Sequence, residues 1–165
     1  MKFITKLVLF TFIFTLTGSY LSAHKNGGEH EPMKKMAHAD HNPKHGGQFF
    51  MAPDRSHHLE GVMASSTEFR IYFYDNHSKP IPATSFEEGS KVEVQRVGPD
   101  GRETGTPVPL PVTVDPSGSF LIASVPGELK LPLYFTTWLM FPNQKEPELF
   151  NFTFDKVSDQ HKHSK

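Results

Sequence analysis

The sequence predicts an all-β fold, an immunoglobulin-like β-sandwich of about seven to eight strands. The first observation is a period of two in which apolar and polar side chains alternate, clearest over residues 69–74, 92–95 and 150–154. Such alternation is typical of strands that bury one face against a core. The second observation is that clusters of Gly, Pro, Asn and Asp separate the runs, and the third is that no segment carries a long helical pattern.

Eight segments are expected to form these strands: residues 48–52, 57–63, 69–74, 92–95, 112–115, 120–125, 131–141 and 150–154. The proline-rich segment 106–111 is expected to run extended beside an edge, because proline cannot donate a ladder hydrogen bond. The alternation also predicts which side chains point inward. The predicted inward set is Phe69, Ile71, Phe73, Val92, Val94, Phe150, Phe152 and Phe154.

The first 23 residues have the anatomy of a secretory signal peptide. A short start carrying Lys2 and Lys6 precedes an apolar run over residues 7–16, and small residues lead to Ala23. We expect cleavage after Ala23 and a periplasmic or secreted mature chain. The alternative is an uncleaved membrane anchor, but a spanning helix needs about 20 apolar residues, and this run is half that length. No stable membrane insertion is therefore expected after cleavage.

The composition of the mature chain excludes several classes of protein. Removal of Lys2 and Lys6 leaves 15 basic and 18 acidic side chains, a net charge of −3, whereas nucleic-acid binding requires a basic surface. The chain has no cysteine, so disulfides and thiolate metal sites are excluded. Any bound metal must be held by imidazole, thioether, carboxylate or backbone groups. The folded part must rely on its own core, which about 110 residues can supply.

Residues 24–44 contain many possible metal donors and almost nothing apolar to bury. We expect a disordered tail there, a β-sandwich domain over residues 45–156, and a second disordered, histidine-containing tail over residues 157–165. A mixture of thioether and imidazole suits copper, and imidazole also suits zinc. The alternative is a solvated polar tail that binds nothing. The predicted tail donors are His24, Met33, Met36, His38 and His41.

His24 is a special case among these donors. If the signal peptide ends at Ala23, His24 supplies a free α-amine together with its imidazole, a two-nitrogen chelate that can hold Cu(II). The alternative is that a histidine follows the cleavage site by coincidence.

A second group of donors lies in the predicted sheet. On a strand, His58 and Glu60 point to one face while His57 and Leu59 point to the other. If Leu59 faces the core, His58 and Glu60 form an outward pair, one pleat step apart, that can share an ion. His57 would then be partly buried and hydrogen-bonded. The alternative is a satisfied structural histidine beside a solvated one.

His45 precedes two glycines at the entrance to the predicted domain. Glycine tolerates positive φ, so the Gly46-Gly47 pair can turn His45 onto the sheet. The alternative is that the two glycines are only the hinge between tail and domain. Met51, a short distance along the chain, offers a thioether. These two residues complete the predicted folded site for copper or zinc, whose candidate ligands are His45, Met51, His57, His58 and Glu60.

The pattern of His-Gly-Gly at 45–47, His-Leu-Glu at 58–60, Phe-Arg-Ile-Tyr-Phe-Tyr-Asp at 69–75 and Lys-Pro at 79–80 resembles a small periplasmic β domain. That domain begins the adaptor subunits of heavy-metal efflux pumps and also occurs as short exported proteins with histidine-rich leaders. The resemblance covers residues 44–155. It implies a compact sandwich that binds copper, zinc or a similar ion near an efflux system, with His45, His58 and Glu60 as ligands. The hairpin, lipoyl and barrel domains of the adaptors have no counterpart in this sequence.

No enzymatic activity is expected, because the sequence lacks a Gly-x-Ser-x-Gly elbow, a phosphate loop, a dinucleotide fingerprint and a cysteine nucleophile. The leading hypothesis is an exported metal-binding protein that buffers or delivers copper or zinc, with the tail recruiting ions to the folded site. One alternative is an immunoglobulin-like structural or interaction module whose histidines are incidental. Another is a copper redox enzyme that uses His24.

The signal-peptide pattern gives the first prediction. Because a short apolar run with a basic start is cleaved rather than retained, we expect the exported protein to begin at His24 and to fractionate away from membranes. Intact-mass measurement on protein recovered from the expressing cell checks this. A mass that still includes Met1, found in the membrane fraction, would contradict it.

Overall fold

The described part of the chain is built from two antiparallel sheets. The computed structural model describes residues 41–86 and 88–159. No helix within these ranges is long and apolar enough to cross a membrane. The predicted signal peptide, residues 24–40 of the predicted tail and residues 160–165 lie outside the described residues. The proposed donors outside them are His24, Met33, Met36 and His38.

The larger sheet, sheet A, contains six strands in the order β1-β2-β3-β8-β7, with β4 paired to β3. The register places Met51 opposite His58 and Phe49 opposite Glu60, and Glu60 is in turn opposite Tyr72. These registers decide which side chains meet on the face that points away from the core. The strands are β1 (Gln48–Met51), β2 (His57–Ser65), β3 (Glu68–Asp75), β4 (Pro80–Ile81), β7 (Val112–Val114) and β8 (Phe120–Ser124).

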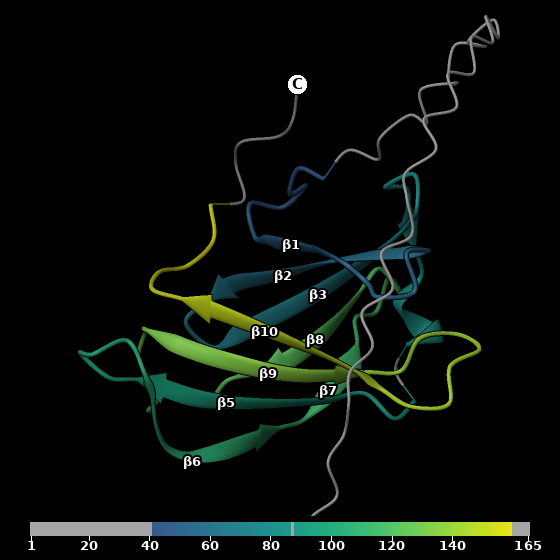
Figure 1. The fold of residues 1–165 in the computed structure, drawn as a ribbon. Helices are drawn as coiled ribbons and strands as arrows, with labels where there is room; N and C mark the ends of the chain where they lie inside the picture. The colour runs from purple at the N-terminus through teal and green to yellow at the C-terminus, as the bar shows by residue number, and fades with distance from the viewer. Residues whose placement is uncertain (1–40, 87, 160–165) are drawn as a thin grey trace, which may run out of the picture. The chain divides into compact units, whose positions relative to one another are not determined.

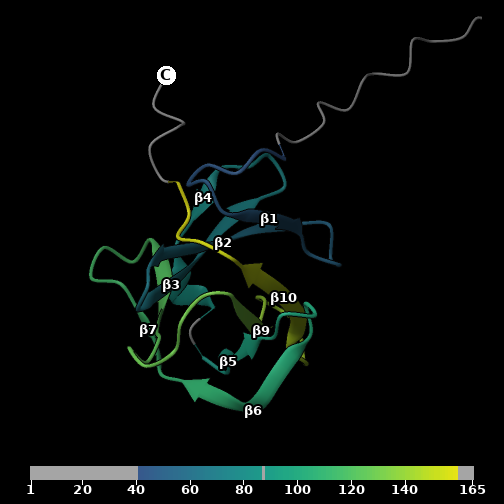
Figure 2. The same ribbon diagram turned by 90° about the vertical axis from the view of Figure 1, so that its left-hand side faces the viewer.

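The smaller sheet, sheet B, contains four strands in the order β10-β9-β5-β6. A single turn of 3-10 helix, Ala83–Ser85, follows β4. Sheet B lies below β1, β2 and β3 in both Figure 1 and Figure 2, so the two sheets form the layers of a sandwich. This arrangement confirms the predicted all-β sandwich. The strands are β5 (Lys91–Val97), β6 (Glu103–Leu110), β9 (Leu133–Leu139) and β10 (Glu148–Phe154).

The described residues form ten strands, so the expected count of seven or eight was too low. All eight segments expected from the sequence form strands, with ends within two residues of those expected. The two additional strands are β4, only two residues long, and β6. β6 contains Pro107 and Pro109 and is one of the two edge strands of sheet B, the other being β10. The proline-rich segment therefore does more than run beside an edge, because it forms that edge.

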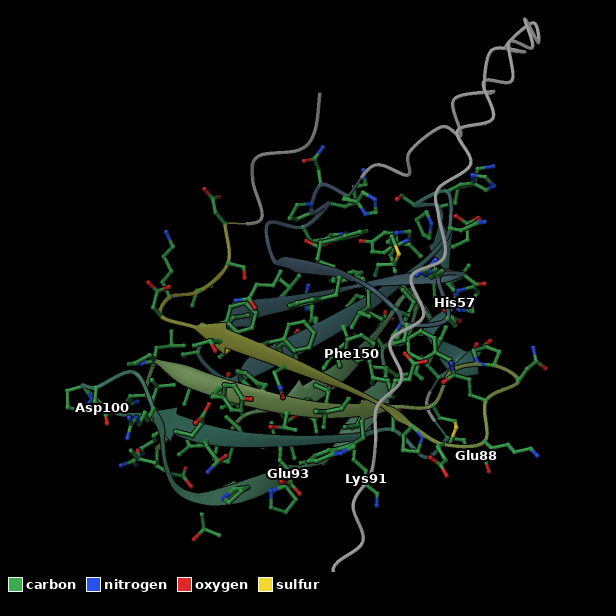
Figure 3. The ribbon with its side chains drawn as sticks, viewed as in Figure 1. His57, Glu88, Lys91, Glu93, Asp100 and Phe150 are labelled. Carbon is green, nitrogen blue, oxygen red and sulfur yellow. The ribbon has the colours of Figure 1, made fainter. Side chains whose placement is uncertain are left out.

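Phenylalanine side chains fill the space between the sheets. All eight residues of the predicted inward set are buried in one core cluster. Phe69 stacks on Phe135 with ring centroids 4.3 Å apart and lies 5.3 Å from Phe152. Gly61 leaves room for the Phe152 ring, because a Cβ on Gly61 would lie 2.3 Å from it. Figure 3 places Phe150 between the two layers.

β2 departs from the alternation because both of its faces are buried from His58 to Met63. Leu59 and Met63 face the core, which confirms the expected orientation of Leu59. His58 and Glu60 therefore point to the outer face of sheet A. Residues 41–47, which we call the leader segment, cross this outer face above β1 and β2 in Figures 1 and 2.

The last described residues extend the ladder of β2 beyond β1. The Ser158 N–H donates to the Met63 carbonyl at 2.8 Å, and the Met63 N–H donates to the Ser158 hydroxyl at 3.0 Å. Gly46 has φ 75° and a Cβ there would lie 2.0 Å from the Asp159 carbonyl oxygen. Only glycine satisfies both the positive φ and this close approach. The leader segment and the C-terminal end of the described chain thus meet at Gly46.

The burial along β10 gives the second prediction. Replacing Phe152, which is fully buried against Gly61 and Phe69, with Ala should lower the free energy of unfolding by about 3–5 kcal/mol. Replacing the neighbouring, exposed Asn151 with Ala should change it by no more than about 0.5 kcal/mol. Denaturant unfolding of the two variants measures both values, and equal costs would mean that the register of β10 is wrong.

Candidate metal centre

Four polar or amphipathic side chains of β2 and β3 lie buried on the outer face of sheet A. His58 is 1% exposed, Glu60 is 0%, Tyr72 is 9% and Tyr74 is 1%. Outer faces of antiparallel sheets are normally solvated. Here the leader segment covers the face. It is held there by hydrogen bonds to Glu60 and by ring contacts to Tyr72 and His58. Residues 41–44 of the predicted tail therefore contribute to the surroundings of the site.

The carboxylate of Glu60 is the centre of these contacts. The backbone N–H groups of His45 and Gly47 donate to Oε1 at 2.8 and 2.9 Å. The backbone N–H of Lys44, the hydroxyl of Tyr74 and Nδ1 of His45 approach Oε2 at 3.0, 2.9 and 3.0 Å. A carboxylate offers about four lone-pair sites, so these five contacts occupy its acceptor capacity. Glu60 thus fixes the leader segment to the sheet.

The hydrogen bonds also decide the ionisation of Glu60. Burial of the carboxyl group raises its pKa, but hydrogen bonds from the His45 ring, the backbone of Gly47 and His45, and the Tyr74 hydroxyl outweigh burial, and the net pKa lies below the ordinary value. Burial and the Glu60 charge together raise the pKa of Tyr74. Near neutral pH the pair is therefore a carboxylate and a neutral phenol, which is the combination that their hydrogen bond requires.

His45 lies where the two glycines allow it to reach the sheet. Its ring stacks on Tyr72 with centroids 3.7 Å apart and planes 9° apart. Because an ionised carboxylate only accepts, the His45 Nδ1 that lies 3.0 Å from Glu60 carries the proton. In the neutral ring, Nε2 is then the nitrogen with a lone pair. The His45 side chain is 38% exposed, whereas the Glu60 side chain is fully buried. The ring that carries this lone pair is therefore accessible from solvent.

His58 is held in a similar way but is buried. Its Nδ1 lies 2.9 Å from the carbonyl oxygen of Asp75, and since a carbonyl only accepts, Nδ1 carries the proton. The turn that presents this carbonyl is fixed by the Asp75 carboxylate, which accepts the N–H groups of His77 and Lys79 at 2.8 and 2.9 Å. The neutral His58 ring therefore has its lone pair on Nε2. Metal-binding histidines are typically oriented by this kind of second hydrogen bond.

Nε2 of His58 is buried and has no hydrogen-bond partner among the described residues. A buried polar atom left unpaired costs about 1–3 kcal/mol, so its presence needs an explanation. Phe49 stacks on one side of the ring with centroids 5.3 Å apart, and the His41 ring lies edge-on with centroids 5.1 Å apart. His41 is exposed. A second imidazole thus lies next to the His58 ring.

Met51 lies directly across from His58 in the β1-β2 ladder. Side chains of opposite residues in an antiparallel pair lie on the same face of the sheet. Met51 is 47% exposed, one of three exposed large hydrophobic side chains in the described part of the chain. His58 therefore has a thioether on its own face as well as an imidazole next to it.

His57 lies on the other face of β2, as expected from the alternation. Its Nδ1 contacts the Asp54 carboxylate, and its ring packs 5.3 Å from Phe141. Burial raises the pKa of Asp54, but hydrogen bonds from His57 and Ser56 outweigh burial, so the net pKa is lowered. Figure 3 shows His57 at the end of the sandwich where β2 begins. His57 is partly buried and hydrogen-bonded, and the sheet separates it from His58.

Within residues 41–86 and 88–159, no three His, Asp or Glu side chains gather where they could hold one ion. Glu60 is paired with His45, whereas His58 is next to His41 and Met51. The sequence-based reasoning missed the roles of Tyr72, Tyr74 and the Asp75 carbonyl. Two tyrosines at the outward positions of β3 were the available signal, since the register places them opposite Glu60 and His58.

Comparison with known proteins adds no relative. No family model, no curated protein and no solved structure matches the chain. The resemblance to the β domain of efflux adaptors therefore stays a prediction.

The contacts of Glu60 give the third prediction. Glu60→Gln keeps the size of the side chain but removes its charge and one acceptor oxygen, so the free energy of unfolding should fall by about 2–4 kcal/mol. Because folding lowers the pKa of Glu60 below 4.5, its contribution in the wild type is present above that value and is lost as pH falls through the lowered pKa. Unfolding measured from pH 7 to pH 3 should show this loss in the wild type and not in the variant.

Hydrogen exchange provides the local readout for the same variant. The backbone amides of Lys44, His45 and Gly47 should lose protection in Glu60→Gln, whereas amides of sheet B should not. Glu88→Gln, at an exposed carboxylate away from sheet A, is the matched control. Protected leader amides in Glu60→Gln would show that Glu60 does not fix the leader segment.

Proposed function

We propose that this protein is an exported, non-enzymatic metal-binding protein that buffers or delivers copper or zinc ions in the periplasm. The observation that carries the proposal is the buried Nε2 of His58. Its neighbour Nδ1 is committed to the Asp75 carbonyl at 2.9 Å, and Nε2 itself has no hydrogen-bond partner among the described residues. A metal ion bound there would satisfy the only unpaired atom of this ring.

The surroundings of His58 support a metal ion rather than a missing hydrogen bond. An imidazole and a thioether, both metal ligands, are its neighbours on this face. The absence of cysteine removes thiolate chemistry, so such ligands are the ones a metal protein of this composition has to use. His45, whose Nδ1 is bound to Glu60, offers a second oriented Nε2 at the surface.

The His/Met-rich residues upstream of the fold suggest a recruiting role. His24, Met33, Met36 and His38 lie outside the described residues, and in this proposal these four donors bind ions with high capacity and modest affinity and pass them to the folded site. The folded site keeps more of the interaction energy as affinity because the β scaffold already holds His58. A component of a heavy-metal efflux system is the proposed recipient of the ion.

Removal of the His58 nitrogen gives the fourth prediction. His58→Asn keeps an N–H donor for the Asp75 carbonyl, since the Asn amide replaces Nδ1, but it removes Nε2. We expect the variant to remain folded and to lose the tightest class of bound copper or zinc, with a fall in affinity of about a hundredfold. Competitive titration of the full chain against a chelator of known strength measures this.

Two variants make the comparison specific. His77→Asn changes an exposed histidine outside the proposed site and should leave the tightest class intact. Replacing His24, Met33, Met36 and His38 together should lower the number of weakly bound ions but retain the tightest one. The proposal fails if His58→Asn leaves the tightest class unchanged, or if the wild-type chain retains no metal at all, which would favour an interaction module with incidental histidines.

A further inference from the structure

We propose that the folded site is selective for Cu(I) and that its ligands are Nε2 of His58, the imidazole of His41 and the thioether of Met51. This inference rests on the proposed function and specifies its ligand set and its metal. It assigns Glu60 and His45 to holding the leader segment in place, and it assigns His41, the first described residue, to the metal.

The β1-β2 register places Met51 and His58 opposite each other, with their side chains on the same face of sheet A. The N–H of Ala52 donates to the carbonyl of His57 at 2.9 Å, so those two residues form a hydrogen-bonded pair. The next pair along the ladder, Met51 and His58, is then of the non-hydrogen-bonded type. In such pairs the opposite Cα atoms are about 4.5 Å apart and the side chains approach most closely. The flexible thioether can therefore reach an ion at His58.

The distance between the two imidazoles fits a shared ion. The centroids of His41 and His58 are 5.1 Å apart with planes at 64°. Two imidazoles that hold one ion through nitrogens about 2.0 Å from it have centroids about 5–6 Å apart. His58 supplies the fixed nitrogen, and the exposed His41 can rotate about its side-chain torsions to present one of its own.

The donor set favours Cu(I) over zinc. Structural zinc sites use four ligands drawn from thiolate, imidazole and carboxylate, and here the carboxylate that shares the outer face of β2 with His58, Glu60, is already occupied by five contacts. A thioether beside two imidazoles is a soft set, and thioether ligands select Cu(I), which is stable at low coordination number. Phe49, stacked on the His58 ring, adds an apolar wall that limits the access of water.

Glu60 acts in this proposal through His41 and does not touch the ion. Its carboxylate ties down Lys44, His45 and Gly47, so the leader segment is fixed three residues after His41. The Glu60 contacts of these three residues therefore keep His41 near His58. The site becomes preorganised on three sides, by the Asp75 carbonyl, by the β1-β2 ladder and by the Glu60 clamp.

The test is the fifth prediction. It uses the full chain with Met33 and Met36 replaced by Leu, so that tail sulfur does not compete. In this background, Met51→Leu keeps the volume and removes the sulfur. Under anaerobic, reducing conditions, competition with a chelator of Cu(I) should show affinity lowered about tenfold or more in Met51→Leu and in His41→Ala. Zinc affinity should change less than about threefold in Met51→Leu, and Met140→Leu, at the residue that follows β9, should match the parent for both metals.

X-ray absorption at the copper edge gives a second readout. The parent loaded with one equivalent of Cu(I) should show a sulfur neighbour beside nitrogen, and Met51→Leu should show nitrogen only. Unchanged Cu(I) affinity and an unchanged spectrum in Met51→Leu would overturn the ligand set while leaving the proposed function intact, provided that His58→Asn still loses the ion. Equal losses of Cu(I) and zinc in Met51→Leu would overturn the selectivity. Retention of Cu(I) by His58→Asn would overturn both proposals.

Discussion

The buried carboxylate of Glu60 is the interaction on which the organisation of this protein's outer face depends. A charge removed from water is costly unless every lone pair finds a donor, and here the donors are three backbone N–H groups of the leader segment together with Tyr74 and His45. One side chain of the sheet therefore fixes three backbone positions of the seven-residue leader segment, and the ring contacts to Tyr72 and His58 add to it. The leader segment is ordered by this anchor rather than by apolar burial.

Two different kinds of histidine result from this arrangement. Nδ1 of His45 donates to Glu60 and the His45 ring stacks on Tyr72, so this ring helps to fix the leader segment to the sheet. Nδ1 of His58 donates to the Asp75 carbonyl and not to Glu60. Both rings are fixed in one tautomer by an oxygen acceptor, but only the His58 ring is buried with a nitrogen left over. The chemistry of the face is thus concentrated on β2 at the end where β1 pairs with it.

The sandwich fold could be predicted from the sequence, and so could the shared outer face of His58 and Glu60. Period-two alternation was sufficient for the core, because Phe69 or Phe152 has no stable place except between the sheets, and it placed His58 and Glu60 on one outward face. It could not show that this face is covered, since the leader segment docks through backbone N–H groups that are the same for any residue type. β6 escaped recognition as a strand because Pro107 and Pro109 lack the donors that a central strand needs, although an edge strand does not need them all.

The contact between Gly46 and the Asp159 carbonyl has a mechanical consequence. Asp159 lies against Gly46, near the end of the leader segment away from His41, so a pull on the C-terminal flank acts on the outer face of sheet A at the Met63 end of β2. Force or tethering there acts first on the Ser158–Met63 ladder and on the leader segment, and only later on the phenylalanine core. A partner that binds the flanks of this domain would therefore also load the leader segment, which positions His41. Sheet B, the other layer of the sandwich, would carry little of that force.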